Sequence, residues 1–316
     1  MTTASLVVAL VLASPAMLVS EAEFLRSVGA EEGILLLQIE GIAGWEDGSF
    51  VVSDKLAGTI ALLDEAGKLV AEADTRGRTG AAGGPASLDC HGRWIAVADF
   101  ASRRIQIFSR DLLLSGAFQS EGPVINLRFA PDGTLWLAAQ TARGKELLHY
   151  DIGGRLLGRL LPRELTGEAF SDVFLCAVNH QGTLALAFCV RNVIEIWDSS
   201  GNFCQLLSVP ELPPEPPGRT MGRGLFGTGL HLPDGPLIRS VATDRKGNLL
   251  ILGGDYGNHP GRDLYVLNTD GEASRALVLA HRASHIWVSE AGLLLAVDQT
   301  KSRVDFYRLH YAEQRP

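Results

Sequence analysis

The chain has 316 residues, 46% hydrophobic and 20% charged, which is the composition of a globular protein with a sizeable core and excludes a disordered or collagen-like chain. Its 28 Lys and Arg against 36 Asp and Glu give a formal charge of −8, which disfavours nucleic acid and anionic lipid as partners. With 35 Gly, 14 Pro and 7% aromatic residues, the chain favours many short strands joined by tight turns over a helical bundle.

An apolar run opens the chain at Leu6 and continues to Val19. It is shorter than the ~20 residues that a membrane-spanning helix needs, and the small residues Ser20 and Ala22 follow where a signal peptidase would cut. Residues 1–5 contain no Lys or Arg, although a signal usually begins with positive charge. We predict a signal peptide over residues 1–22, no membrane span, and a periplasmic or secreted protein. The alternative is a buried or frayed N-terminal segment.

Six segments then repeat one order: an apolar stretch, a turn with Gly, a second apolar stretch, a polar loop and an alternating third stretch. Asp, Asn and Gly in these turns tolerate the positive φ that β-hairpins require. Successive turn glycines are 44, 41, 49, 65 and 45 residues apart, at Gly48, Gly92, Gly133, Gly182, Gly247 and Gly292. The stretches after them are too short for helices and predict strands, at 49–54, 93–99, 134–140, 183–189, 248–254 and 293–298.

The third stretch of each repeat alternates apolar and polar residues, as in 105–109 and 304–308, and predicts a further strand. Four strands per repeat of about 40–45 residues suit a β-propeller blade, because one twisted sheet must stack on neighbours to bury its faces. The sequence therefore predicts an all-β, six-bladed β-propeller of four-stranded antiparallel blades, in one domain over residues 23–316. The sixth repeat ends after its third strand, so we expect residues 23–30 to add the outer strand and close the ring.

The long interval of 65 residues comes from an insertion over residues 209–236, between the fourth and fifth blades. It joins an outer strand to the next inner strand, and such loops share a rim, the usual ligand face of a propeller, with the loops between second and third strands. Five prolines make its first half extended, whereas its second half is rich in Gly and apolar residues, including Phe226. We expect a lid or a partner-docking element on this rim; a loop without function is the alternative.

Segments 97–108 and 296–307 share a pattern of strand end, Asp, short polar loop, Arg and alternating strand. The pattern resembles the NHL-type repeat of six-bladed propellers, and residues 53–68 are a weaker copy. In all three, an Asp precedes the first apolar residue of the alternating strand by six positions: Asp54 before Ile60, Asp99 before Ile105 and Asp298 before Val304. The resemblance covers about residues 23–310; it implies the fold and carries no chemistry.

Four of the eight histidines fall in segments that we assign to the rim: His231, His259, His281 and His285. Three His with an open fourth position is a catalytic zinc arrangement. A lyase that cleaves peptidyl-α-hydroxyglycine is similar in its NHL-like fold and holds zinc through His, so His231, His259 and His281 are the candidate zinc ligands. Solvated loop residues are the alternative, because the four share no repeated spacing.

Glu40 in blade one and Asn126 in blade three resemble two ligands of the lactonase and esterase propellers, which hold a divalent cation on their axis. That family needs an Asp at the start of blade five, where this chain has Arg239, and a cation would be repelled there. Arg128, Arg239, His285 and Glu40 instead predict a channel mouth of mixed charge, which holds an acidic ligand group or pairs internally.

The four cysteines, Cys90, Cys176, Cys189 and Cys204, lack CxxC spacing and are expected to be free. No GxSxG, P-loop or HExxH motif occurs in the sequence. We therefore predict a monomeric binding or scaffolding propeller without a cofactor. It engages a protein or a small ligand through its loop rim, at Glu40, Asn126, Arg128, Arg239, His285 and Phe226. The alternative is a metal-dependent propeller enzyme of the lyase or the lactonase and esterase kind, with zinc or calcium bound.

Overall fold

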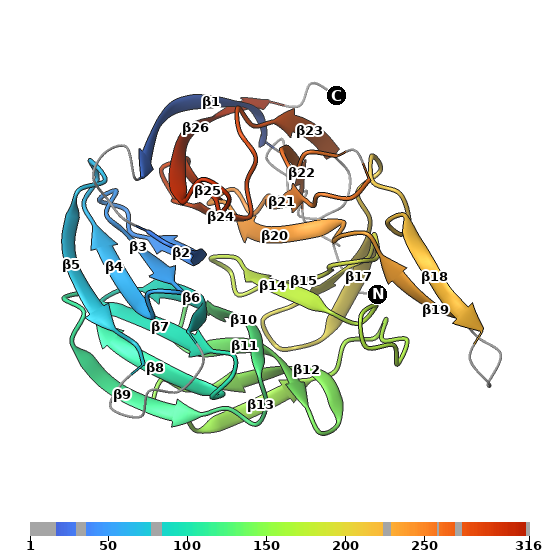
Figure 1. Ribbon diagram of the computed structural model, residues 1–316, viewed down its shortest axis with the longest axis horizontal. Coiled ribbons are helices and arrows are strands. Elements are labelled where there is room, and N and C mark those ends of the chain that lie inside the picture. Colours follow the sequence, from blue (N-terminus) through green and yellow to red (C-terminus); the bar gives the residue numbers. More distant parts are fainter. Residues whose placement is uncertain are drawn as a thin grey trace, which may run out of the picture.

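The computed structural model describes residues 17–29, 36–76, 84–223, 229–257, 259–268 and 274–313. This part of the chain consists of strands, turns and loops and contains no helix, hence none that could cross a membrane. Six four-stranded antiparallel sheets stand around a central axis as the blades of a propeller (Figure 1). The predicted fold class is confirmed.

The first five blades each run in chain order from an inner strand at the axis to an outer strand at the perimeter. Blade one consists of β2 (Ile39–Gly44), β3 (Phe50–Asp54), β4 (Thr59–Leu63) and β5 (Leu69–Asp74). Blade two consists of β6 (Pro85–His91), β7 (Trp94–Asp99), β8 (Arg104–Ser109) and β9 (Leu114–Gln119). Blade three consists of β10 (Val124–Phe129), β11 (Leu135–Thr141), β12 (Gly144–Tyr150) and β13 (Leu156–Leu160).

The last three blades include the insertion and the closure of the ring. Blade four consists of β14 (Phe174–Val178), β15 (Leu184–Phe188), β16 (Ile194–Trp197) and β17 (Phe203–Leu207). Blade five consists of β20 (Ile238–Thr243), β21 (Leu249–Gly253), β22 (Asp263–Leu267) and β23 (Ser274–Val278). Blade six consists of β24 (His285–Val288), β25 (Leu293–Asp298), β26 (Arg303–Glu313) and, as its outer strand, β1 (Met17–Gly29).

The turn between the first and second strands is built alike in five of the six blades, and blade two has a shorter turn at Gly92. The six predicted turn glycines have φ between +55° and +82°, the left-handed region that Gly adopts without strain. In five of the six, the glycine N–H closes the turn by donating to the carbonyl three residues earlier, as Gly133 does to Ala130 at 2.9 Å. The glycine spacing in the sequence therefore locates the turns correctly.

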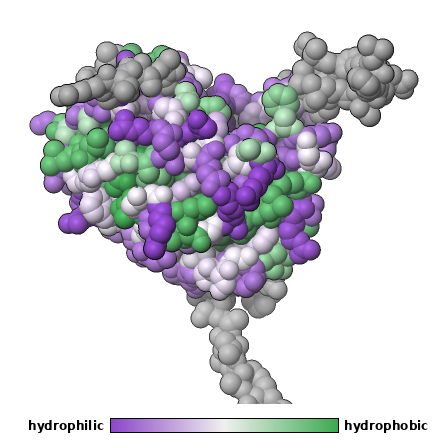
Figure 2. Space-filling view, turned by 90° about the horizontal axis from the view of Figure 1, so that it is seen from below, coloured by the Kyte–Doolittle hydropathy of each residue, from purple (hydrophilic) through white to green (hydrophobic). Residues whose placement is uncertain are grey.

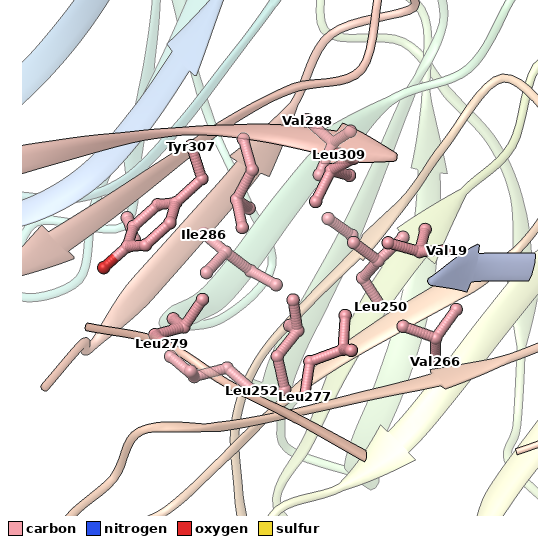
Figure 3. Packing of buried hydrophobic residues seen from close by; sticks show 14 of the residues in the cluster. Val19, Leu250, Leu252, Val266, Leu277, Leu279, Ile286, Val288, Tyr307 and Leu309 are labelled. Atoms are coloured by element: carbon pink, nitrogen blue, oxygen red, sulfur yellow. The ribbon is translucent and has the colours of Figure 1, made fainter. Parts of the chain in front are cut away.

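β1 closes the ring by pairing with β26, from Met17 opposite Glu313 to Gly29 opposite Arg303. The expected closing strand is confirmed over residues 23–29, and it extends further back than expected, to Met17. Val19 is fully buried there and packs with Leu250 and Val266 of blade five (Figure 3). Part of the predicted signal peptide thus belongs to the outer strand of blade six. Cleavage stays a prediction, and residues 1–16 lie outside the described part.

The core consists of apolar layers between neighbouring blades. The second strands β3, β15 and β21 are buried along their whole length, because both faces of each sheet are covered by adjacent blades. The outer strands β5 and β17 carry no fully buried residue. Seen from the side of the ring where β9 and β13 lie, apolar and hydrophilic areas are small and interspersed (Figure 2). Each blade is thus stabilised mainly by its two neighbours.

The insertion between blades four and five has two unlike halves. The first is anchored to blade four, because the Asn192 side chain donates to the carbonyls of Val209 and Leu212 at 2.8 and 2.9 Å. The second forms a two-stranded hairpin of β18 (Gly218–Arg223) and β19 (Gly229–Pro233). The hairpin runs outward from the perimeter of the ring (Figure 1). Its described strands therefore do not form a lid over the channel.

All four cysteines are free, as expected. Cys176 lies opposite Leu186, not Cys189, in the β14–β15 pair. Burial raises the pKa of the Cys176 thiol to about 12 and that of Cys189 to about 12. These two side chains are therefore protonated thiols at neutral pH and weak nucleophiles.

Candidate functional site

The two faces of the propeller carry different kinds of connection. The loops from an outer strand to the next inner strand, together with those between second and third strands, form what we call the loop face. The turns between first and second strands, and those between third and fourth strands, form the opposite turn face. The inner strands β2, β6, β10, β14, β20 and β24 line a channel between the two faces (Figure 1).

A repeated β-bulge shapes the loop-face end of the channel. In blades one, two, three and five, the pairing of the inner strand with the second strand skips one residue near the start of the inner strand. Such bulges re-aim a side chain without ending the sheet. The skipped residues are Glu40, Ala86, Ile125 and Arg239. Glu40 and Arg239 thus occupy equivalent positions in two blades, as the sequence comparison predicts.

Five of the six predicted ligand residues line one small pocket at this end of the channel: Glu40, Asn126, Arg128, Arg239 and His285. The sixth, Phe226, lies outside the described residues. The pocket has a volume of about 60 Å³, enough for a few water molecules. Sites for small organic ligands usually measure about 300–1,000 Å³. The sequence therefore correctly predicts that these five residues lie together. The pocket that they line is too small for a typical organic ligand.

Neighbouring side chains pair with Glu40 and Arg239 at this mouth of the channel. Arg239 and Arg282 each pair with Asp255, one on either carboxylate oxygen. Glu40 accepts a hydrogen bond from Gln38 and lies 3.5 Å from the Lys55 ammonium. Of the two predicted alternatives, internal pairing therefore describes Glu40 and Arg239.

Asn126 takes part in a repeated bond between blades. Its Oδ1 accepts a hydrogen bond from the backbone N–H of Cys176, in the inner strand of the next blade, at 2.9 Å. Ser87 and Ser240 accept the corresponding bonds from the inner strands of blades three and six, both at 3.1 Å. The Asn126 carbonyl is therefore already engaged in holding two inner strands together.

His285 is a neutral imidazole at physiological pH. Burial, together with the positive charges of Arg239 and Arg128, lowers its pKa to about 4. Its Nδ1 lies 3.0 Å from the Ser284 hydroxyl. His285 thus offers an acidic ligand no positive charge near pH 7.

The predicted zinc ligands sit in different surroundings. His259 lies 3.6 Å from Asp263 in blade five, and His281 lies 3.1 Å from the buried Asp305 of blade six. The backbone of His231 belongs to β19 of the outward hairpin. Among the described side chains, which do not include that of His231, no three His, Cys, Asp or Glu form a group able to hold a metal. The zinc site stays a prediction.

The turn face holds a cavity that the sequence analysis does not anticipate. It measures about 390 Å³ and lies at the other end of the channel, between the first turns of five blades. Its lining includes Asp89, His91, Arg128, His180, Arg245, Trp287 and Glu290. The sequence contains a sign of this cavity, because several of its charged and His residues lie in the turns that the repeated glycines define. Hairpin turns usually serve only to connect strands, so they are easily passed over.

The loop face carries exposed apolar side chains from separate loops. Five large ones are 48% to 62% exposed: Leu37, Leu56, Phe100, Leu161 and Phe170. Other exposed large apolar residues lie largely on the outer strands around the perimeter, such as Val70 on β5 and Val278 on β23. Sequence alone does not reveal the exposed set, because nothing in the pattern separates an apolar loop residue that is buried from one that is not.

The Asp of the NHL-like pattern caps the loop between second and third strands. In blade one, Asp54 Oδ1 accepts the N–H of Ala57 at 2.9 Å, and in blade two Asp99 accepts that of Ser102 at 2.9 Å. In blade six, Asp298 accepts the Thr300 N–H at 3.1 Å. The residue four positions after each Asp has a left-handed backbone: Gly58 (φ +71°), Arg103 (φ +57°) and Ser302 (φ +50°). The pattern therefore encodes one loop conformation that three blades share.

No protein-family model and no curated protein matches the chain. Among solved structures, selenomethionine-substituted virginiamycin B lyase from Staphylococcus aureus is similar, with a TM-score of 0.57 and 12% identity over 90% of this chain and 99% of that one. A streptogramin B lyase has a TM-score of 0.56 and 13% identity over 92% and 97%. The WD40 repeats of RRP9 have a TM-score of 0.61 and 12% identity over 94% and 100%. At these identities the likeness concerns the fold alone, and it supports the assignment of the chain as a β-propeller.

Proposed function

We propose that this chain is a non-catalytic binding or scaffolding propeller that engages a protein partner through its loop face. The observation that carries the proposal is the set of five exposed apolar side chains on that face. Exposed apolar side chains on one face supply the apolar contacts that a protein partner buries on docking. At the nearby channel mouth, Glu40 and Arg239 are already paired with Lys55 and Asp255, so the exposed apolar side chains are the main groups left for a partner on this face.

The loops that present these side chains are ordered before any partner arrives. The Asp172 carboxylate accepts hydrogen bonds from the N–H groups of Thr166 and Gly167, both at 2.7 Å, within the loop that carries Leu161 and Phe170. Asp54 holds the loop of Leu56 in the same manner, through the Ala57 N–H. Because an ordered loop loses little entropy on binding, these contacts favour association.

The test compares two double variants of the full chain. Leu56→Glu with Phe100→Glu places charge on the loop face, whereas Val70→Glu with Leu114→Glu places the same charges on exposed outer-strand positions of the same two blades. Proteins that co-purify with the wild-type chain and with the outer-strand variant, but not with the loop-face variant, support the proposal. If both variants retain the same proteins, the loop face is not the docking surface. Melting temperatures check that both variants fold.

The likeness in fold to a virginiamycin B lyase and a streptogramin B lyase favours one alternative, a metal-dependent propeller enzyme of the lyase or lactonase kind. Zinc or calcium would then lie near the loop face, with His231, His259 and His281 as the candidate zinc ligands. Metal analysis of the purified full chain distinguishes the two functions. One equivalent of zinc or calcium supports the enzyme, whereas a fully folded protein without metal supports the binding module. We propose that the protein is a monomer, and its molecular mass in solution tests this.

We propose further that the blades are NHL-type repeats and that the protein is exported to the periplasm or secreted. The shared conformation of the loops after Asp54, Asp99 and Asp298 supports the first proposal. The apolar run from Leu6 to Val19 supports the second. Cell fractionation of the full chain tests export directly.

A further inference from the structure

The turn-face cavity is large enough for a small organic molecule. Its volume of about 390 Å³ lies within the range of known ligand sites, while the opposite mouth of the channel measures about 60 Å³. Four of the five blades that line it share one turn, closed by the N–H of the turn glycine, so most of the cavity rim is a repeated part of the fold. A ligand would enter from the turn face, opposite the proposed docking surface.

Arg128 provides a cation at the floor of this cavity. It lines both the cavity and the narrow mouth, and so lies in the channel between them. Its guanidinium donates to the carbonyls of Leu127 and Val241, at 2.8 and 3.3 Å, and bridges blades three and five. These two bonds leave further N–H donors, since a guanidinium has five. No carboxylate of the described residues lies within the ion-pair distance of 4.0 Å, in contrast to Arg239.

Asp89 provides a carboxyl group in the wall of the same cavity. It belongs to β6, next to the β10 strand of Arg128, and one of its oxygens accepts the backbone N–H of Phe129 at 2.8 Å. Burial raises the pKa of this carboxyl, and the positive charge of Arg128 opposes that rise. Asp89 and Arg128 thus form a separated pair of opposite charges, both of which lack a contacting counter-charge in the described structure.

Aromatic side chains complete the wall of the cavity. Phe129 and Trp287 both line it, alongside the small or aliphatic side chains of Ala130, Val178, Ala242, Ile286 and Val288. The Trp287 ring lies directly against the backbone of Gly44, where an added Cβ would approach it to 2.9 Å. Gly44 therefore allows the ring its position. The walls favour a ligand whose body is flat and apolar.

We propose that the turn-face cavity binds a small zwitterion with an apolar body, such as an aromatic amino acid, with its carboxylate on Arg128 and its ammonium on Asp89. A ligand with only one of these charges would leave the other protein charge desolvated and unpaired, which is costly. A carboxylate and a guanidinium also match in bidentate geometry. The proposal does not depend on the proposed function of the loop face.

Three probes of one shape test the charges separately: L-phenylalanine, 3-phenylpropionate without the ammonium, and 2-phenylethylamine without the carboxylate. Isothermal titration calorimetry with the full chain measures their affinities. We expect phenylalanine to bind with one-to-one stoichiometry and at least about tenfold more tightly than either analogue, as for a charged pair inside a protein. Equal affinities for the three, or no binding of phenylalanine at about 10 mM, would overturn the proposal.

Two variants locate the site. Asp89→Asn keeps an acceptor for the Phe129 N–H and should abolish the preference for phenylalanine over phenylpropionate. Arg128→Lys keeps a positive charge and should weaken phenylalanine binding, while Arg128→Gln should abolish its preference over phenylethylamine. Arg245→Gln at the exposed edge of the cavity is the control and should change affinity less than threefold. If Asp89→Asn and Arg128→Gln fold but leave all affinities unchanged, the proposal is wrong.

A loop-face control separates this proposal from the proposed function. The double variant of Leu56 and Phe100 leaves the turn face untouched, so it should bind phenylalanine as the wild-type chain does. Loss of a protein partner together with retained phenylalanine binding would support both proposals. If the double variant retains the partner while Asp89→Asn loses phenylalanine binding, only the proposal for the loop face is refuted.

Discussion

The two faces of the ring are built from the same repeats and yet differ in almost every physical property. The loop face has connections of unequal length, exposed Leu and Phe side chains, and a mouth of about 60 Å³ where Glu40 and Arg239 pair with neighbouring side chains. The turn face has short turns, most of one conformation, around a cavity of about 390 Å³, with Asp89 and Arg128 lacking contacting counter-charges. One face suits a large partner with apolar surface, and the other suits a small charged molecule.

The difference follows from which connections are free to vary. A hairpin turn between two paired strands is constrained by both of them, so five of the six first turns share one length and one closing hydrogen bond, and the turn at Gly92 is shorter. A connection between blades carries no such constraint, and it tolerates the insertion between blades four and five at little entropic cost. Changes in loop length therefore alter which partner the loop face can bind. Changes in the side chains of the turns alter which ligand the cavity can bind.

Loss of β1 should have the largest effect, because both faces need a closed ring. Without residues 17–29, β26 becomes an exposed edge and the apolar surface of blade five that Val19 covers is opened to water. We expect aggregation, or a fall in melting temperature of more than about 10 °C, by differential scanning calorimetry. A chain that lacks only residues 1–16 is the control. A chain that begins at Glu23 should fall between the two, and an unchanged melting temperature in all three would show that closure does not depend on β1.

The loop face should respond differently to changes in the two halves of the insertion. Asn192→Ala removes three hydrogen bonds with Val209 and Leu212, so it should lower the free energy of unfolding by about 2–4 kcal/mol. Replacement of residues 218–233 by a short Gly and Ser linker should lower it by less than about 1 kcal/mol, because the hairpin pairs only with itself in the described structure. Urea denaturation measures both. A large loss from the hairpin deletion would show that it packs on the ring.

Acid should weaken the channel between the faces through His285. Its pKa of about 4 in the folded protein lies below the ordinary value of 6.5, so the unfolded chain binds the proton more readily. This contribution to stability is complete above about pH 6.5 and is lost as the pH falls towards 4, with a slope of at most about 1.4 kcal/mol per pH unit. Urea denaturation of wild type and His285→Asn at several pH values between about 4 and 7.5 isolates the slope. Parallel curves for the two proteins would contradict this assignment.

Substitutions at residues with positive φ should have the smallest effects. They should change the free energy of unfolding in opposite directions on the two faces. Arg103 on the loop face is a non-glycine residue at φ +57°, so Arg103→Gly should raise the free energy of unfolding by about 0.5 kcal/mol. Gly92 on the turn face has φ +55° and no atom within 4 Å of an added Cβ, so Gly92→Ala should lower it by about 1 kcal/mol through strain alone. Thermal unfolding measures both variants. Shifts of the same sign would show that contacts outweigh the backbone conformation.

Much of the fold could be predicted from sequence because the same pattern of turn glycine and strands occurs six times. The turn glycines fix where each hairpin reverses, and the alternating strands fix which side chains face a neighbouring blade. The extension of β1 to Met17 was not predicted, because an apolar run at the start of a chain is equally typical of a signal peptide. The choice between the two rests on a partner strand nearly 300 residues away, which no local pattern can show.

The candidate site was predicted in part. Glu40 and Arg239 are found at equivalent places because a bulge repeats at the start of their inner strands. Their neutralisation depends on Lys55, Asp255 and Arg282, which other segments contribute, so it could not be read from spacing. The turn-face cavity was missed for a similar reason, since its volume is set by how far apart the inner strands stand. That distance is a property of the ring as a whole.

The pairing of β1 with β26 also determines when the protein can finish folding. The Ser20 hydroxyl donates to the His310 carbonyl across 290 positions of the sequence, so the outer strand of blade six is synthesised before every other described strand and its partner β26 after all of them. Blades one to five can stack as the chain emerges, but both flanks of that open stack stay exposed until the end. Contacts of such long range form slowly, because the intervening chain must lose conformational entropy before these contacts stabilise the fold. The ring is therefore most open to misassociation in the interval just before its last strand arrives.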